Sequence, residues 1–277
     1  LFYLKKFLRH LYRNINAYQA NIRETDHACR YTTAWGLISP KEKQCGQENW
    51  FIRLLLCGFS VIMRAVQDNF TEYDMREYDK MIKGEIYNPS DEELTKMRAR
   101  VRKLTREYNL TDEDEQERRQ ELLHEIFGSH GGFIYCEPPL RFDYGCNTHV
   151  GDDFFANFNL VVLDVAPVKI GRQCFIGPNV SIVTPVHPFL ACDRNMRRAP
   201  NGGKFDYEYA RPITIGDNVW LASNVTVCGG VTIGHDTVIG AGSVVTRDIP
   251  AGVFAAGNPC RVIRPLTEKD KMKLPSE

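Results

Sequence analysis

A histidine between two prolines is the side chain in this sequence best suited to acid–base chemistry. His187 lies in the run Pro185-Val-His-Pro188. An imidazole has an ordinary pKa of about 6.5, so it can accept a proton at neutral pH. The two prolines restrict the backbone that carries the ring. His187 is therefore a candidate general base, which would remove a proton from a reacting group, and the alternative is a histidine at the surface of a loop.

The segment that carries His187 interrupts a six-residue repeat. Aliphatic residues occupy one phase of this repeat, at Ile170, Ile176, Ile182, Ile215, Leu221, Val227, Ile233, Ile239 and Val245. Small or β-branched residues stand four positions after five of them, at Val219, Val225, Val231, Thr237 and Ser243. Residues 182 and 215 are thirty-three positions apart, which is not a multiple of six. Residues 184–212 are therefore expected to leave the repeat as a long loop, a common place for function.

A six-residue period predicts a β-solenoid with three flat faces and about eighteen residues per coil. Each aliphatic side chain would point inward and stack on its copy in the next coil, which gives a continuous core. Gly, Asn or Asp near each corner would permit the tight turns. We predict this solenoid over residues 131–266.

Residues 71–130 have a helical pattern instead. Asn88-Pro-Ser-Asp-Glu-Glu93 predicts a helix start, with Ser90 as the cap and Glu93 three residues later. Apolar residues then recur at spacings of three and four, at Leu94, Met97, Val101, Leu104 and Tyr108. A second helix is expected from Thr111 to Phe127. Together these helices would form a cap before the solenoid.

Composition excludes several classes of protein. The 277 residues include 35 Lys+Arg and 35 Asp+Glu, so the net charge of zero offers no global attraction for nucleic acid or an anionic membrane. Hydrophobic residues are 43%, which is typical of a globular protein and argues against wholesale disorder. The nine cysteines include no CxxC pair and are expected to be reduced and buried, as in the cytoplasm.

The two ends of the chain are set apart from these regions. Residues 1–70 hold ten Lys/Arg and five Asp/Glu, which makes them a basic N-terminal extension to which we assign no function. Their apolar run, Leu54–Met63, is only ten residues long, whereas a membrane span needs about twenty. Residues 267–277 form a C-terminal tail.

Short motifs along the chain give the sequence a family resemblance. In order, they are Gly84-Glu-Ile-Tyr87, Tyr108-Asn109, Phe154-Phe-Ala-Asn-Phe-Asn159, Leu163-Asp-Val165, His187-Pro188, Ile215-Gly-Asp-Asn-Val-Trp220, Ile239-Gly-Ala-Gly-Ser243 and Ala256-Gly-Asn-Pro-Cys-Arg-Val-Ile-Arg264. From about residue 74 to 266 the chain resembles the maltose/galactoside O-acetyltransferases of the hexapeptide-repeat superfamily. The resemblance implies a left-handed parallel β-helix with a helical cap, a homotrimer, acetyl-CoA as donor and a sugar hydroxyl as acceptor.

The resemblance also implies roles for individual residues. His187 corresponds to the catalytic histidine of the family, and transfer is expected to be direct, within a ternary complex. Glu208 stands where maltose-type relatives carry a glutamate, and a carboxylate beside an imidazole orients it and stabilises the imidazolium. Asn157 matches the asparagine that binds substrate and stabilises the transition state, because an amide N–H can donate to developing negative charge.

Two further sets of residues follow from the same match. The set expected to contact coenzyme A includes arginines for its phosphates, and comprises Trp220, Ser223, Ala241, Thr246, Arg247, Arg261 and Arg264. The set expected to contact the acceptor is Asp143, Asn157, Asp164, Tyr87 and Asp91. Val165 departs from the galactoside-type pattern, because its side chain cannot bind a sugar hydroxyl.

Other functions remain open at this point. The same scaffold could acetylate an amino sugar, another amine or an antibiotic, or could serve as an interaction subunit that binds a partner through residues 1–70. A zinc carbonic anhydrase is disfavoured because the position five residues after His187 is Cys192, and no metal is expected. A nucleophilic cysteine is also disfavoured, because Cys192, Cys228 and Cys260 have no adjacent histidine.

Overall fold

The structure is a computed structural model that describes residues 75–199 and 202–275, all within the compact unit Asp74–Glu277. The predicted basic extension 1–70 and its apolar run lie outside the described residues. Within the described part of the chain, no helix is long and apolar enough to cross a bilayer.

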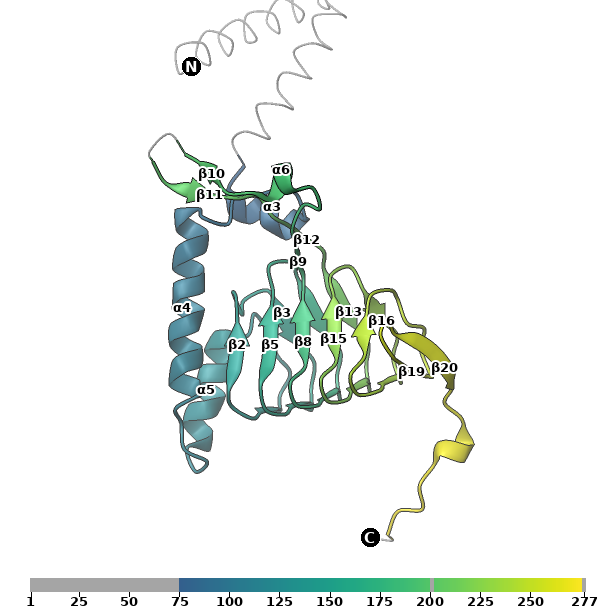
Figure 1. Cartoon of the computed structure of the whole chain (residues 1–277). Helices are drawn as coiled ribbons and strands as arrows, with labels where there is room; N and C mark the ends of the chain where they lie inside the picture. Colours follow the sequence, from purple (N-terminus) through teal and green to yellow (C-terminus); the bar gives the residue numbers. More distant parts are fainter. Residues whose placement is uncertain (1–74, 200–201, 276–277) are drawn as a thin grey trace, which may run out of the picture. The chain divides into compact units, whose positions relative to one another are not determined.

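Three of the five sheets among the described residues are the three faces of a solenoid (Figure 1). Face 1 consists of β1 (Ile134–Cys136), β4 (Phe154–Ala156), β7 (Phe175–Ile176), β14 (Trp220–Leu221), β17 (Val238–Ile239), β19 (Val253–Ala256) and β20 (Arg261–Pro265). Face 2 consists of β2 (Leu140–Phe142), β5 (Leu160–Leu163), β8 (Ser181–Val183), β15 (Thr226–Cys228) and β18 (Val244–Val245). Face 3 consists of β3 (Thr148–Val150), β6 (Val168–Ile170), β13 (Ile213–Ile215) and β16 (Thr232–Ile233).

The chain visits faces 1, 2 and 3 in turn, and every pair of neighbouring strands within the faces is parallel except β19 and β20. We call the corner between faces 1 and 2 edge A, and the corner between faces 2 and 3 edge B. The predicted parallel β-helix of hexapeptide repeats with N-terminal helices is therefore confirmed.

Inward-facing aliphatic side chains form the core of the solenoid. All nine predicted aliphatic positions are at most 5% exposed, and the five positions four residues later are at most 2% exposed. Neighbouring coils place like positions in register, as where Leu221 pairs with Ile176 on one side and with Ile239 on the other. The six-residue period thus identifies the buried side chains.

Coil length differs from the prediction in the first half of the solenoid. Thr226 pairs with Val244, eighteen residues later, as expected. Leu140 pairs instead with Leu160, twenty residues later, so the coils before the long loop each contain two extra residues. The extra residues lie in the turns, because the strands keep their in-register pairing.

Tight corners depend on residues that adopt left-handed backbone conformations. Seven described residues other than glycine have a positive φ between 54° and 62°, and six of the seven are Asn or Asp. Asn218 and Asp236 are two of them, and the Asn218 amide donates to the Asp236 carboxylate at 2.7 Å. Short polar side chains tolerate this conformation, which explains their recurrence at the corners.

The predicted loop forms an arm that leaves face 2 at edge B (Figure 1). Its base is the antiparallel pair of β9 (Pro185–Val186) and β12 (Tyr209–Ala210). Beyond this base lie α6 (Ala191–Arg194) and the hairpin of β10 (Arg197–Arg198) with β11 (Lys204–Phe205).

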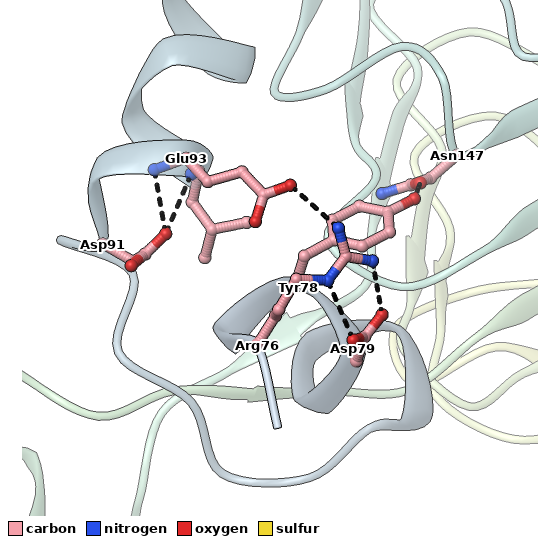
Figure 2. Close-up of polar contacts among 7 residues, drawn as sticks. Arg76, Tyr78, Asp79, Asp91, Glu93 and Asn147 are labelled. Atoms are coloured by element: carbon pink, nitrogen blue, oxygen red, sulfur yellow. Dashed lines mark hydrogen bonds and ion pairs between the residues drawn. The ribbon is translucent and has the colours of Figure 1, made fainter. Parts of the chain in front are cut away.

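From residue 75 onward, three helices precede the solenoid: α3 (Glu77–Lys83), α4 (Glu92–Tyr108) and α5 (Gln116–Ile126). The buried face of α4 includes Leu94, Val101 and Tyr108, as the spacing predicted. The prediction that Ser90 caps α4 is wrong. The carboxylate of Asp91 accepts hydrogen bonds from the backbone N–H groups of Glu93 and Leu94 instead (Figure 2).

The start of α3 is joined to the other parts of the cap by polar side chains (Figure 2). The guanidinium of Arg76 donates to Asp79 and to Glu93, which links α3 to α4. The hydroxyl of Tyr78 donates to Asn147 at 3.2 Å, just before β3 of the solenoid. The cap is therefore tied to the first coil.

Truncation of one inward residue should measure the strength of the core. Ile233 is fully buried, whereas Thr232 beside it points outward. Ile233→Ala should lower the free energy of unfolding by about 2–5 kcal/mol, because it leaves a cavity in the stack. Thr232→Ala should change it by less than about 0.5 kcal/mol. Denaturant unfolding of both variants tests this, and equal losses would contradict the assigned inward face.

Candidate active site

The base of the arm holds His187 beside the solenoid. In the pair of β9 and β12, Val186 lies opposite Tyr209 and Pro185 lies opposite Ala210. His187 follows β9 directly, so this short two-stranded ladder fixes where its backbone begins. The imidazole is 49% exposed and is therefore accessible to a ligand.

Two carboxylates flank the His187 ring. Glu208 Oε1 lies 3.7 Å from Nε2, and Asp206 Oδ2 lies 3.9 Å from Nδ1. Both acidic side chains are only 18% exposed, so water screens them poorly. Contacts of this kind are often long before substrate binds and shorten in the complex. The arrangement suits a base whose positive charge must be stabilised after it accepts a proton.

Asp206 was not predicted from the sequence. A signal for it exists, because Asp206 and Glu208 are two residues apart in an extended segment and alternate side chains of such a segment share one side. The family resemblance pointed to Glu208 alone, so Asp206 was missed.

The carboxylate of Glu208 accepts a hydrogen bond from the cap. The hydroxyl of Tyr87, which is 1% exposed, donates to Glu208 Oε2 at 2.7 Å. Tyr87 was predicted as an acceptor contact, but in the structure its hydroxyl is committed to this carboxylate. Burial, and then the charge of Glu208, raise the pKa of Tyr87, so the hydroxyl keeps its proton.

The group of His187, Asp206 and Glu208 also has the composition of a metal site. One potential ligand atom from each residue lies within 4.8 Å of the others. However, the two carboxylates lie closest to different ring nitrogens, and an ion can take only one of them. Glu208 also uses its second oxygen for Tyr87. The geometry therefore fits a base between two acids better than a metal centre.

Asn157 lies at edge A, directly after β4. Its amide oxygen accepts the backbone N–H of Phe158 at 2.8 Å, which fixes the orientation of the amide. No hydrogen bond of the described residues uses its NH₂ group, so this donor is available to a ligand.

The predicted coenzyme A residues fall into three places in the fold. Ser223 and Ala241 lie at edge A with Asn157, in turns that follow β14 and β17. Thr246 and Arg247 lie at edge B, directly after β18, and both are exposed. Trp220, Arg261 and Arg264 lie on face 1, where Trp220 is 51% exposed.

Arg264 already has an anionic partner in this structure. Its guanidinium donates to both oxygens of Asp270, at 2.8 and 2.6 Å. Asp270 lies in the short helix η1 (Glu268–Asp270) of the C-terminal tail. Hydrogen bonds from Arg264 and from the Thr267 backbone lower the pKa of Asp270 to about 2, so the pair is charged at neutral pH.

Three acidic residues predicted as acceptor contacts have different surroundings. Asp164 is fully buried, and its carboxylate accepts the Tyr144 backbone N–H and the Thr148 hydroxyl at 2.8 and 3.0 Å. Asp91 caps α4, as described above. Asp143 is partly exposed, at 20%, and it pairs with Arg102 at 3.4 Å. Burial raises the pKa of Asp143, although the positive charge of Arg102 opposes this.

Comparisons with known proteins identify the architecture. Residues 80–131 match the maltose acetyltransferase hexapeptide capping motif, residues 212–247 match the bacterial transferase hexapeptide model with its six repeats, and residues 167–187 match the hexapeptide repeat of succinyl-transferase. The chain is 43% identical to the galactoside O-acetyltransferase of Escherichia coli, over 68% of this chain and 88% of that protein. The chain belongs to the maltose/galactoside O-acetyltransferase family.

Solved structures agree with this assignment. A maltose O-acetyltransferase from Clostridium difficile is 47% identical, with a TM-score of 0.65 over 70% of this chain and 99% of its own. A galactoside acetyltransferase in complex with coenzyme A is 40% identical, with a TM-score of 0.66 over 73% of this chain and 97% of its own.

Two cysteines considered as nucleophiles are unsuited to that role in this member of the family. Burial raises the thiol pKa of Cys228 and of Cys260, so both are protonated at neutral pH. A protonated thiol is a poor nucleophile. Cys192 is exposed on α6 of the arm.

Substitution should distinguish a structural role of Asp164 from an acceptor-binding role of Asp143, both at edge B. Asp164→Ala leaves two donors without a partner inside the protein and should lower the melting temperature by at least about 5 °C. Asp143→Ala should change the melting temperature by less than about 2 °C, because an ion pair with an exposed arginine contributes little. It should instead raise KM for the acceptor. Unchanged acceptor KM in Asp143→Ala would remove this residue from the site.

Proposed function

We propose that this protein transfers the acetyl group of acetyl-CoA to a hydroxyl group of a sugar, of the maltose, glucose or galactoside kind. The observation that carries the proposal is the imidazole of His187, exposed at the base of the arm and flanked by two carboxylates. An alcohol is a weak nucleophile until a base removes its proton, and this arrangement supplies such a base. The coenzyme A in the solved relative supports the choice of donor.

The reaction balances with the residues present. His187 takes the proton of the sugar hydroxyl as the oxygen attacks the thioester carbonyl carbon. The resulting oxyanion accepts a hydrogen bond from the NH₂ of Asn157. When the carbonyl re-forms, the carbon–sulfur bond breaks, and the protonated His187 returns its proton to the leaving sulfur. Glu208 stabilises the imidazolium while it carries the proton.

The site is proposed to lie between copies of the chain in a homotrimer. His187 extends from edge B, whereas Asn157 and Ser223 lie at edge A, on the opposite side of face 2. A donor that contacts both edges can do so if edge B of one copy faces edge A of its neighbour. Cyclic symmetry then builds identical sites at each interface. The cytoplasmic location remains a prediction.

Loss of the imidazole should abolish most turnover. His187→Ala should reduce kcat by at least about 10²-fold without changing the melting temperature, because a positioned base contributes about that much. A thiol-release assay with acetyl-CoA and a panel of sugars, amino sugars and amines measures this and identifies the acceptor class. Wild-type turnover in the variant would remove the proposed base. Thiol release only with amines would show that the acceptor is an amine and not a sugar. If coenzyme A does not raise the melting temperature of the protein, the interaction-subunit alternative is favoured.

Mixing two inactive variants should restore activity if each site is shared. In co-expressed His187→Ala and Asn157→Ala chains, about a quarter of the interfaces would combine an intact His187 with an intact Asn157. Activity should therefore recover to about a quarter of the wild-type value. Each variant expressed alone is the control. Assembly of the mixed protein without recovery would place both residues in a site within one chain.

A further inference from the structure

Among the described residues, hydrogen bonds join the cap to the arm at Tyr87 and Glu208. Tyr87 and Glu208 form an antiparallel bridge, in which the Tyr87 N–H donates to the Glu208 carbonyl at 3.0 Å and the Glu208 N–H donates to the Tyr87 carbonyl at 3.2 Å. Their side chains add the 2.7 Å hydrogen bond from the Tyr87 hydroxyl to Glu208 Oε2. Three hydrogen bonds therefore join one residue of the cap to one residue of the arm.

The surroundings leave this junction little freedom. Gly84, between α3 and Tyr87, has a φ of 75°, and a side-chain carbon there would lie 2.8 Å from the Ala210 carbonyl oxygen. The end of α3 therefore lies directly against β12. Tyr87 belongs to a buried cluster with Met81, Leu94 and Ala210. The ring is fixed by packing, so its hydroxyl is a rigid donor.

The junction lies beside the proposed base, because Glu208 belongs to both. Glu208 precedes β12, β12 pairs with β9, and His187 follows β9. Glu208 directs Oε2 toward Tyr87, while Oε1 lies 3.7 Å from His187 Nε2. The other carboxylate, Asp206, has no comparable hydroxyl donor among the described hydrogen bonds. The two acids beside His187 are therefore not equivalent.

We propose that Tyr87 is a positioning residue that holds Glu208 beside His187, so that the helical cap is a working part of the active site. This inference rests on the proposed function. A hydroxyl donor stabilises the charged form of the carboxylate and fixes its rotamer. Glu208 then balances the charge of the imidazolium without taking its proton. The other polar groups that face Tyr87 are Tyr144 and Arg98, which are hydrogen-bonded to each other at 2.6 Å.

Removal of one hydroxyl tests the inference. Tyr87→Phe keeps the ring and should lower kcat about tenfold, while KM for acetyl-CoA stays within about twofold. The acidic limb of the pH profile of kcat/KM should shift in Tyr87→Phe, because the carboxylate beside the proposed base is no longer fixed. Glu208→Gln should produce the same shift. The double variant should lose no more activity than Glu208→Gln alone, because the two residues act as one unit.

A matched control separates positioning from stability. The buried hydroxyl of Tyr108 donates to the Cys136 carbonyl, so Tyr108→Phe removes a comparable bond from the cap away from the arm. Tyr108→Phe should reduce the melting temperature about as much as Tyr87→Phe but leave kcat and the pH profile unchanged.

Other outcomes overturn the inference. Full kcat in Tyr87→Phe, or activity losses that add up in the double variant, would make Tyr87 a merely structural residue. If Tyr87→Phe does not fold, Glu208→Gln decides, and a wild-type pH profile in that variant would refute the role of the pair. If the wild-type protein has no activity with any acceptor tested, the proposed function itself is refuted.

Discussion

Backbone hydrogen bonds between successive coils are the constraint on which the rest of this structure depends. Each coil offers its N–H and C=O groups to the next, so no coil can shift without moving its neighbours. The inward aliphatic positions then stack in register, as at Leu221 between Ile176 and Ile239. The corners line up in the same way, which turns them into continuous edges. An extended ligand such as coenzyme A matches an edge of this kind, and an insertion at one corner becomes an arm beside it.

The arm and the edges divide the chemistry between distant parts of one chain. His187 and its carboxylates belong to edge B, while the free amide of Asn157 belongs to edge A. Within the part of the chain that the structure describes, the proposed base and the proposed oxyanion donor therefore lie at different edges. The same rigidity that aligns residues along an edge prevents the two edges of one coil from approaching each other. The proposed homotrimer would bring such edges together, with edge B of one copy facing edge A of the next.

The sequence pattern predicts repetitive features well and singular contacts poorly. The six-residue phase identified buried residues such as Ile233, because every coil repeats the same environment. It missed the twenty-residue coils, since the extra residues lie in turns that carry no aliphatic signal. It also could not distinguish Asp164 from Asp143, which follow strands of the same face but differ in burial. Likewise, the bond between Tyr87 and Glu208 joins positions 121 residues apart, and no local pattern encodes it.

Asp270 has a consequence for any anionic ligand that uses Arg264. The guanidinium donates two hydrogen bonds to this carboxylate, which belongs to the C-terminal tail of the same chain. A phosphate that arrives there exchanges one anion for another, so the net gain is the difference between two similar attractions. Added salt weakens both, and the balance between them changes little. An anionic ligand at Arg264 must therefore displace Asp270, and most of its binding free energy must come from contacts elsewhere along the solenoid.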